Sequence, residues 1–131
     1  MKKAEKINRF SDKKFLIIDE YEDLREAISS LCLSCGAGTI VTRDGRVLLF
    51  QAIEEKPDLI IINPGKETRS GLYTCKLLKN HGETKHIPIL LTIADHLVQH
   101  YAENNLSSID DFLIKPFGTE ELMEKIEQIF K

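Results

Sequence analysis

Four polar residues of this chain have the chemistry needed to bind a metal ion or a phosphoryl group. Asp19 and Glu20 are adjacent carboxylates. Asn63 is a carboxamide, and Lys115 is a cation followed directly by proline. Carboxylates bind hard divalent cations such as Mg²⁺, and an ammonium group offsets negative charge that develops during phosphoryl transfer. The four residues therefore indicate phosphoryl or metal chemistry, provided that the fold brings them together.

Each of these residues stands at the end of a short apolar run typical of a buried strand. Five such runs alternate with segments of helical spacing, and this alternation predicts an α/β fold with a doubly wound parallel sheet and helices on both faces. The ligand site of such a sheet lies beyond the carboxyl ends of its strands. We therefore expect the four residues to share one cleft. The predicted strands cover 14–18, 39–42, 59–62, 89–93 and 110–114, and the predicted helices cover 21–33, 47–53, 70–78, 95–103 and the segment from 119 onward.

The length of 131 residues fits one compact domain. Residues 1–14 carry six basic and two acidic side chains, which leaves 12 basic and 19 acidic side chains for the rest. We predict a solvated basic tail over residues 1–13 and a folded, acidic domain over residues 14–131. An acidic domain is a poor ligand for nucleic acid. No apolar run is long enough to span a membrane and no secretion signal is evident, so we expect a cytoplasmic protein.

Other candidate sites are weaker. Cys32 and Cys35 form a C-x-x-C pair, but the pair ends a predicted helix instead of beginning one, and we interpret both as structural. His96 and His100 are spaced to bind one metal ion, but no third ligand lies nearby in the sequence. Hydrolase and dinucleotide-binding motifs are also absent. We predict no enzymatic activity.

The order of these motifs resembles the receiver domain of two-component response regulators. The resemblance covers about residues 14–130 and rests on KFLIIDE at 14–20 with Arg25, PDLIII at 57–62, Gly71-Leu72, and DDFLIKPF at 110–117. It implies a flavodoxin-like sheet with strand order 2-1-3-4-5.

The resemblance also implies roles for single residues. In this family an acidic pair and an aspartate after the third strand hold Mg²⁺, and that aspartate accepts a phosphoryl group from a histidine kinase. A serine or threonine after the fourth strand and a lysine hold the phosphoryl oxygens. Asp19 and Glu20 match the acidic pair, and Lys115 matches the lysine. Phe112 matches an aromatic switch residue, although core packing explains it equally well.

Two positions depart from the family pattern. Asn63 stands where the phosphoacceptor aspartate belongs, and the family spacing places Ile93 at the serine or threonine position. Thr92 comes one residue early, so we expect its hydroxyl to point to the opposite face of the sheet. A carboxamide has no anionic oxygen to attack phosphorus and is a poorer Mg²⁺ ligand than a carboxylate. We expect no phosphorylation at Asn63, and weak Mg²⁺ binding at most.

The predicted function is therefore an atypical receiver that acts without phosphorylation, as a protein-interaction or dimerisation module for a histidine kinase or an effector. A homodimer is expected through the face formed by residues 95–103, 110–114 and the last helix, with Leu97, Val98 and Tyr101 as candidate contacts. Helix amphipathicity explains these three residues equally well. One alternative is a receiver phosphorylated on another carboxylate, such as Asp19 or Glu20. Another is a metal-dependent hydrolase built on the same pair, while a structural ion pair with Lys115 needs no metal.

Overall fold

The computed structural model describes residues 9–19, 28, 30, 35–64, 68–103 and 111–131. The predicted strands are all present within these residues, and their ends agree with the prediction to within a residue or two. The helix predicted over 21–33 lies mostly outside the described residues, although Ile28 is helical and buried. The elements are β1 (Lys14–Asp19), β2 (Gly38–Thr42), the 3-10 helix η1 (Gly45–Val47), α3 (Leu48–Glu55), β3 (Leu59–Asn63), α4 (Thr68–Lys79), β4 (Ile89–Ala94), the 3-10 helix η2 (Asp95–Leu97), α5 (Val98–Glu103), β5 (Asp111–Lys115) and α6 (Thr119–Ile129).

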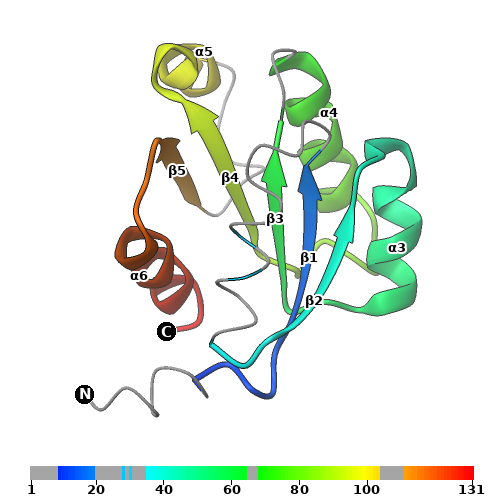
Figure 1. Cartoon of the computed structure of the whole chain (residues 1–131). Coiled ribbons are helices and arrows are strands. Elements are labelled where there is room, and N and C mark those ends of the chain that lie inside the picture. Colours follow the sequence, from blue (N-terminus) through cyan, green and yellow to red (C-terminus); the bar gives the residue numbers. More distant parts are fainter. Residues whose placement is uncertain (1–8, 20–27, 29, 31–34, 65–67, 104–110) are drawn as a thin grey trace.

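The five strands form one parallel sheet in the order β2-β1-β3-β4-β5, which confirms the predicted topology. The strand order reverses between β1 and β3, and all five strands end at the same edge of the sheet (Figure 1). The register pairs Asp19 with Asn63 and Ala94 with Lys115. The fold therefore brings the ends of β1, β3, β4 and β5 together, as the ligand-site rule for such sheets requires.

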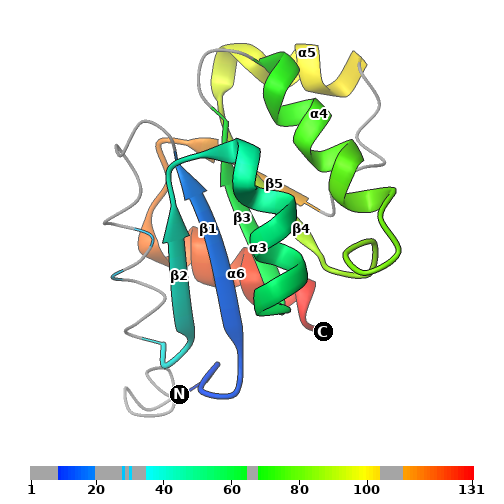
Figure 2. The ribbon, with the colours of Figure 1, turned by 90° about the vertical axis from the view of Figure 1, so that its right-hand side faces the viewer.

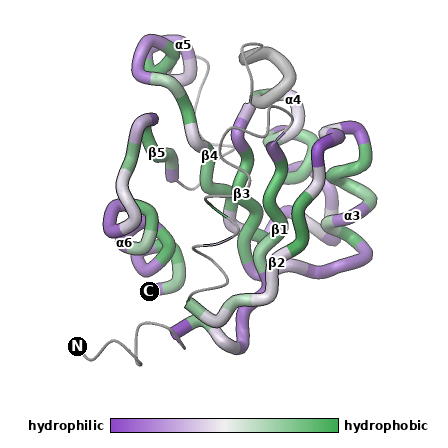
Figure 3. The backbone as a smooth tube through the Cα atoms, viewed as in Figure 1, coloured by the Kyte–Doolittle hydropathy of each residue, from purple (hydrophilic) through white to green (hydrophobic). Residues whose placement is uncertain are grey.

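Helices cover both faces of the sheet. The helices α3 and α4 lie side by side on one face, and α6 lies on the other (Figure 2). Strand β3 is buried along its whole length, as expected for the central strand of a parallel sheet. Along the chain, apolar segments follow the strands and polar segments mark the outer turns and helix surfaces (Figure 3).

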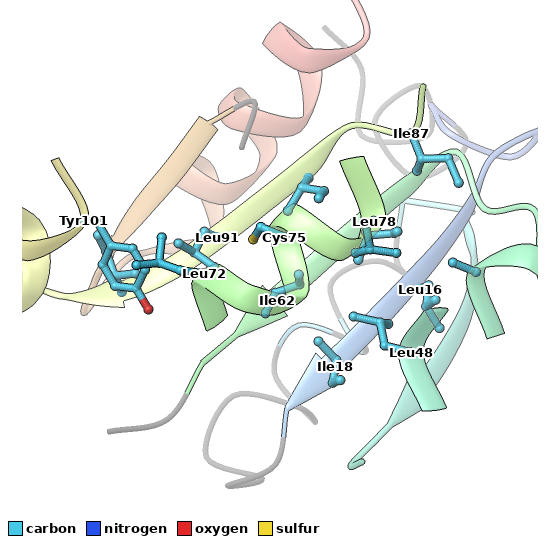
Figure 4. Close-up of a cluster of buried hydrophobic side chains, with 14 residues drawn as sticks. Leu16, Ile18, Leu48, Ile62, Leu72, Cys75, Leu78, Ile87, Leu91 and Tyr101 are labelled. Atoms are coloured by element: carbon cyan, nitrogen blue, oxygen red, sulfur yellow. The ribbon is translucent and has the colours of Figure 1, made fainter. Parts of the chain in front are cut away.

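Alternation along each strand divides the core into two apolar clusters. Leu16 and Ile18 point into the cluster beneath α3, α4 and α5, which Figure 4 shows, while Phe15 and Ile17 point into the cluster beneath α6. Successive strand residues face opposite sides of a sheet. The cluster to which a strand residue belongs therefore tells which face of the sheet it occupies.

The N-terminal end of the folded unit lies earlier than predicted. Phe10 is only 5% exposed and packs against Phe15 and Phe130. Arg9 forms an ion pair with Glu127 of α6, and the Lys13 ammonium lies over the Phe130 ring. The prediction of a solvated tail is therefore wrong for Phe10, because an aromatic side chain buried between a strand and a helix belongs to the core.

Helix α5 corrects a second expectation. Tyr101 is fully buried, and Leu97 and Val98 pack against the same apolar cluster (Figure 4 shows Tyr101). Burial excludes Tyr101 as a docking contact, whereas Leu97 and Val98 are half-buried and their part in a docking surface stays a prediction. Cys35 and Cys75 are buried free thiols, in agreement with a structural role. Within the described residues, no helix has the length and apolar character required to cross a membrane.

Candidate functional site

The site begins with a contact between the last residues of β1 and β3. Asp19 is fully buried and Asn63 is 2% exposed. The Asn63 Nδ2 group donates a hydrogen bond of 3.0 Å to Asp19 Oδ1. Ile17 and Ile61, two residues earlier on each strand, belong to the α6-side cluster. The carboxylate and the carboxamide therefore face the α6 side of the sheet at its carboxyl edge.

The other side of the Asn63 amide meets two hydrogen-bond donors. Lys115 Nζ donates to Asn63 Oδ1 at 2.7 Å, and Thr92 Oγ1 donates to the same oxygen at 2.9 Å. The amide thus presents its NH₂ group to a carboxylate and its oxygen to a cation and a hydroxyl. Only this orientation satisfies all three partners, because a reversed amide would direct its NH₂ group at the ammonium. A neutral carboxamide links the Asp19 carboxylate to the Lys115 ammonium.

The position of Thr92 shows that the predicted orientation of its hydroxyl is wrong. Thr92 lies on the same face as Asn63, whereas Ile93 belongs to the apolar cluster on the opposite face. The pairing of β3 with β4 explains the difference, since Ile62 is opposite Leu91 and the next residues along both strands are Asn63 and Thr92. The family spacing predicts a position along the chain, but the pairing of β3 with β4 determines which residue of β4 lies on the same face of the sheet as Asn63. Thr92 is the one polar residue in an otherwise apolar run, and this is the sequence signal for a place in the polar site.

Comparison with known proteins shows the family to which this chain belongs. The family model described as the response regulator receiver domain matches residues 15–127. The chain belongs to the response regulator receiver family. Proteins of this family are receiver domains of two-component signalling, and the sheet order and site location described above are those expected for a receiver.

Individual relatives of this receiver are distant. It is 26% identical over 114 residues to Protein PilG of Pseudomonas aeruginosa, covering 87% of this chain and 84% of that protein. The structure of the chemotaxis response regulator CheY4 of Vibrio cholerae superposes with a TM-score of 0.79 at 23% identity, covering 89% of this chain and 98% of the other. The receiver domain of the sensor histidine kinase PA1611 of P. aeruginosa, which has a magnesium ion coordinated in its active site cleft, gives a TM-score of 0.77 at 20% identity, covering 88% and 95%. The receiver spans about half the length of some other curated relatives that it matches.

Among the described residues, the predicted site residue Phe112 does not take part in this hydrogen-bonded group. Glu20 lies outside the described residues. Phe112 is half-buried on β5 and packs against the apolar cluster beneath α5. Core packing accounts for the position of Phe112, and a switch role for it stays a prediction.

The described residues of the receiver fit a Mg²⁺ ion poorly. Among them no group of three His, Cys, Asp or Glu side chains could hold a metal ion. The Asn63 oxygen, which would have to serve as a ligand, is already in contact with the Lys115 ammonium. The Asp19 carboxylate meets the NH₂ group of the same amide. Within the described residues, one buried carboxylate and one ammonium group lie on opposite sides of the Asn63 amide.

Proposed function

We propose that this receiver is not switched by phosphorylation at Asn63, and that it acts in the cytoplasm as a protein-interaction or dimerisation module of a two-component pathway. Its partners are a histidine kinase or an effector, and it has no enzymatic activity and no nucleic-acid-binding role of its own. One observation carries the proposal. Asn63, which the family spacing assigns to the phosphoacceptor position, is a buried carboxamide held by Asp19, Thr92 and Lys115.

The chemistry of the carboxamide supports this proposal. An acyl phosphate forms when an anionic carboxylate oxygen attacks phosphorus, and a carboxamide has no such oxygen. The Asn63 oxygen already accepts two hydrogen bonds, which draws its electron density toward Lys115 and Thr92. Spontaneous conversion of Asn63 to aspartate is also disfavoured, because that rearrangement needs the backbone N–H of the next residue and Pro64 has none.

The alternative acceptors have less support. Asp19 is fully buried, and its Oδ1 atom accepts a hydrogen bond from the Asn63 amide. A phosphoryl donor would have to displace this contact to reach the carboxylate. Glu20 lies outside the described residues and stays an untested alternative. The hydrolase alternative needs a metal centre, and among the described residues no group of three His, Cys, Asp or Glu side chains could hold a metal ion.

A surface for protein partners is available on the α5–β5–α6 side. Ile114 of β5 is 37% exposed at the edge of the sheet. Asp111 accepts an ion-pair contact of 3.1 Å from Lys125 of α6, which fixes that helix relative to the strand. The exposed surface of α6 carries three acidic side chains, Glu120, Glu121 and Glu124. We propose this acidic, edge-strand surface as the contact face for a kinase, an effector or a dimer partner.

Binding of beryllofluoride with Mg²⁺, followed by NMR, tests the proposed state of the site. Beryllofluoride imitates a phosphoryl group on a carboxylate, so we expect no shifts of the wild-type amide signals. The Asn63→Asp variant is the matched control. We expect it to show shifts at the ends of β1, β3 and β5. Shifts of the same size in the wild-type protein would contradict the proposal, because the site would then accept a phosphoryl analogue without an aspartate at position 63.

A further inference from the structure

The exposed apolar side chains are concentrated on one surface. Six large apolar side chains of the described residues are exposed to solvent, and four of them lie on η1, α3 and α4. The most exposed are Phe50 at 64% and Tyr73 at 66%. The helices α3 and α4 pack side by side, as Figure 2 shows, and the exposed apolar residues lie on these two helices and on the adjoining η1. We call this set the α3–α4 patch; its members are Val47, Phe50, Tyr73 and Leu77.

Charged residues flank Phe50 in a regular order. Arg46, Phe50 and Glu54 are spaced four residues apart along η1 and α3, which follow each other without a break. Residues four apart in a helix lie on the same side of it. The Arg46 side chain is 91% exposed, and Glu54 is also exposed. One side of α3 therefore presents Phe50 and Glu54, and the exposed Arg46 lies on the 3-10 turn η1 that leads into this helix.

The charges on either side of Phe50 are opposite, so two copies of this segment that run antiparallel have complementary charges. If the α3 helices of two copies pack antiparallel about a two-fold axis through Phe50, Arg46 of each copy meets Glu54 of the other. A two-fold interface makes every unlike contact twice, so a single helix pair supplies two ion pairs. The two Phe50 rings meet at the centre, where aromatic side chains contribute most to an interface. Tyr73 and Leu77 extend the apolar contact along α4.

We propose that a second copy of this chain docks on the α3–α4 patch and forms a two-fold symmetric dimer with antiparallel α3 helices. This surface is separate from the α5–β5–α6 side, and its use does not depend on whether Asn63 accepts a phosphoryl group.

The contacts of Arg46 within one copy are compatible with this dimer. Arg46 forms hydrogen bonds to both carboxylate oxygens of Asp44, at 2.9 to 3.2 Å. An exposed ion pair of this kind adds little to stability. A guanidinium group has several N–H donors and can hold a second carboxylate. In the proposed dimer, Arg46 holds Glu54 of the second copy in addition to Asp44 of its own copy.

Sedimentation equilibrium of the 131-residue chain over a range of concentrations tests the proposal. We expect a monomer–dimer equilibrium for the wild-type protein. The Phe50→Asp variant places a charge at the two-fold axis and should raise the Kd roughly tenfold or more. The matched control is Val41→Asp, which introduces the same charge on the edge strand β2 and should leave the Kd unchanged, whereas Ile114→Asp tests the α5–β5–α6 side as the other dimer face. All substituted residues are exposed, so circular dichroism melting should confirm that each variant stays folded.

A charge swap tests the antiparallel register. Arg46→Glu alone and Glu54→Arg alone each place like charges in contact and should weaken the dimer. The double variant restores opposite charges at both contacts and should recover most of the wild-type affinity. A wild-type protein that stays monomeric at millimolar concentration would overturn the proposal. A dimer weakened by Ile114→Asp but not by Phe50→Asp, or a double variant that stays as weak as the single ones, would overturn it as well.

Discussion

The amide oxygen of Asn63 lies 2.7 Å from Nζ of Lys115. On its other side the same amide donates to the Asp19 carboxylate, so a neutral group separates two opposite charges. An aspartate in this place would bring two buried carboxylates together, and such a pair needs a cation or a proton to be stable. In the proposed account, the carboxamide removes the nucleophile and leaves the Asp19 carboxylate with a neutral neighbour.

The Asn63→Asp variant should be less stable than the wild-type protein in metal-free buffer. The substitution replaces a hydrogen-bond donor with a second carboxylate oxygen facing Asp19, and we expect a loss of about 1–3 kcal/mol in the free energy of unfolding. Mg²⁺ should recover much of this loss in the variant and change the wild-type melting temperature little. Thermal melts with EDTA and with Mg²⁺ measure both effects. Equal stability of the two proteins in EDTA would contradict the geometry described for the amide.

Thr92 and Ile93 should differ in their coupling to Asn63. Thr92→Val removes the hydroxyl that donates to Asn63 and should cost about 1–2 kcal/mol. Ile93→Val removes one methylene-sized group from the opposite face and should cost about 0.5–1.5 kcal/mol. Double-mutant cycles with Asn63→Ala, followed by urea unfolding, separate the two. We expect a coupling of about 0.5–3 kcal/mol between Asn63 and Thr92, and additive effects for Asn63 and Ile93. Coupling with Ile93 and additivity with Thr92 would instead place Ile93 beside Asn63, as the family spacing predicts.

Phe10 should contribute to stability as a core residue. Its ring is buried against Phe15 and Phe130, so Phe10→Ala should lower the free energy of unfolding by about 3–5 kcal/mol. A chain that begins at Lys14 should be destabilised relative to one that begins at Arg9. Chemical denaturation of the two chains provides the comparison. If both unfold at the same denaturant concentration, residues 9–13 are a solvated tail after all.

Tyr101 should make stability fall at alkaline pH. Burial raises the pKa of Tyr101 to about 12 from an ordinary value of 10.0. Between these values the unfolded chain loses the phenol proton first, so the folded state binds more protons and stability decreases as pH rises, by about 1.4 kcal/mol per pH unit. Below pH 10 both states keep the proton and no effect is expected.

The Tyr101→Phe variant isolates this contribution from that of other titrating groups. The Tyr101 hydroxyl has no hydrogen-bond partner among the described residues, so its removal should cost little stability at neutral pH. The difference in unfolding free energy between wild type and variant should shift in favour of the variant above pH 10. A difference that stays constant from neutral to alkaline pH would mean that the hydroxyl is not buried.

The sheet and the meeting of Asp19, Asn63 and Lys115 could be predicted from sequence because short apolar runs mark buried parallel strands, and their carboxyl ends must meet. The face occupied by Thr92 depends on the pairing of β3 with β4, and the family spacing used for the prediction does not report that pairing; the only local signal is that Thr92 is the one polar residue of its run. Phe10 was missed for a different reason. Phe10 is one aromatic residue in a basic stretch. The net charge of that stretch predicts a solvated tail, but it does not report that a single side chain packs against residues far along the chain.

Incubation of the wild-type chain with acetyl phosphate and Mg²⁺, followed by intact-mass spectrometry, tests the central claim most directly. We predict no species heavier by one phosphoryl group in the wild-type protein, and such a species in the Asn63→Asp variant treated in parallel. The variant serves as the positive control for donor and metal. A stable phosphorylated wild-type protein, with the label lost in Asp19→Asn, would contradict the account and assign the acceptor to the acidic pair instead.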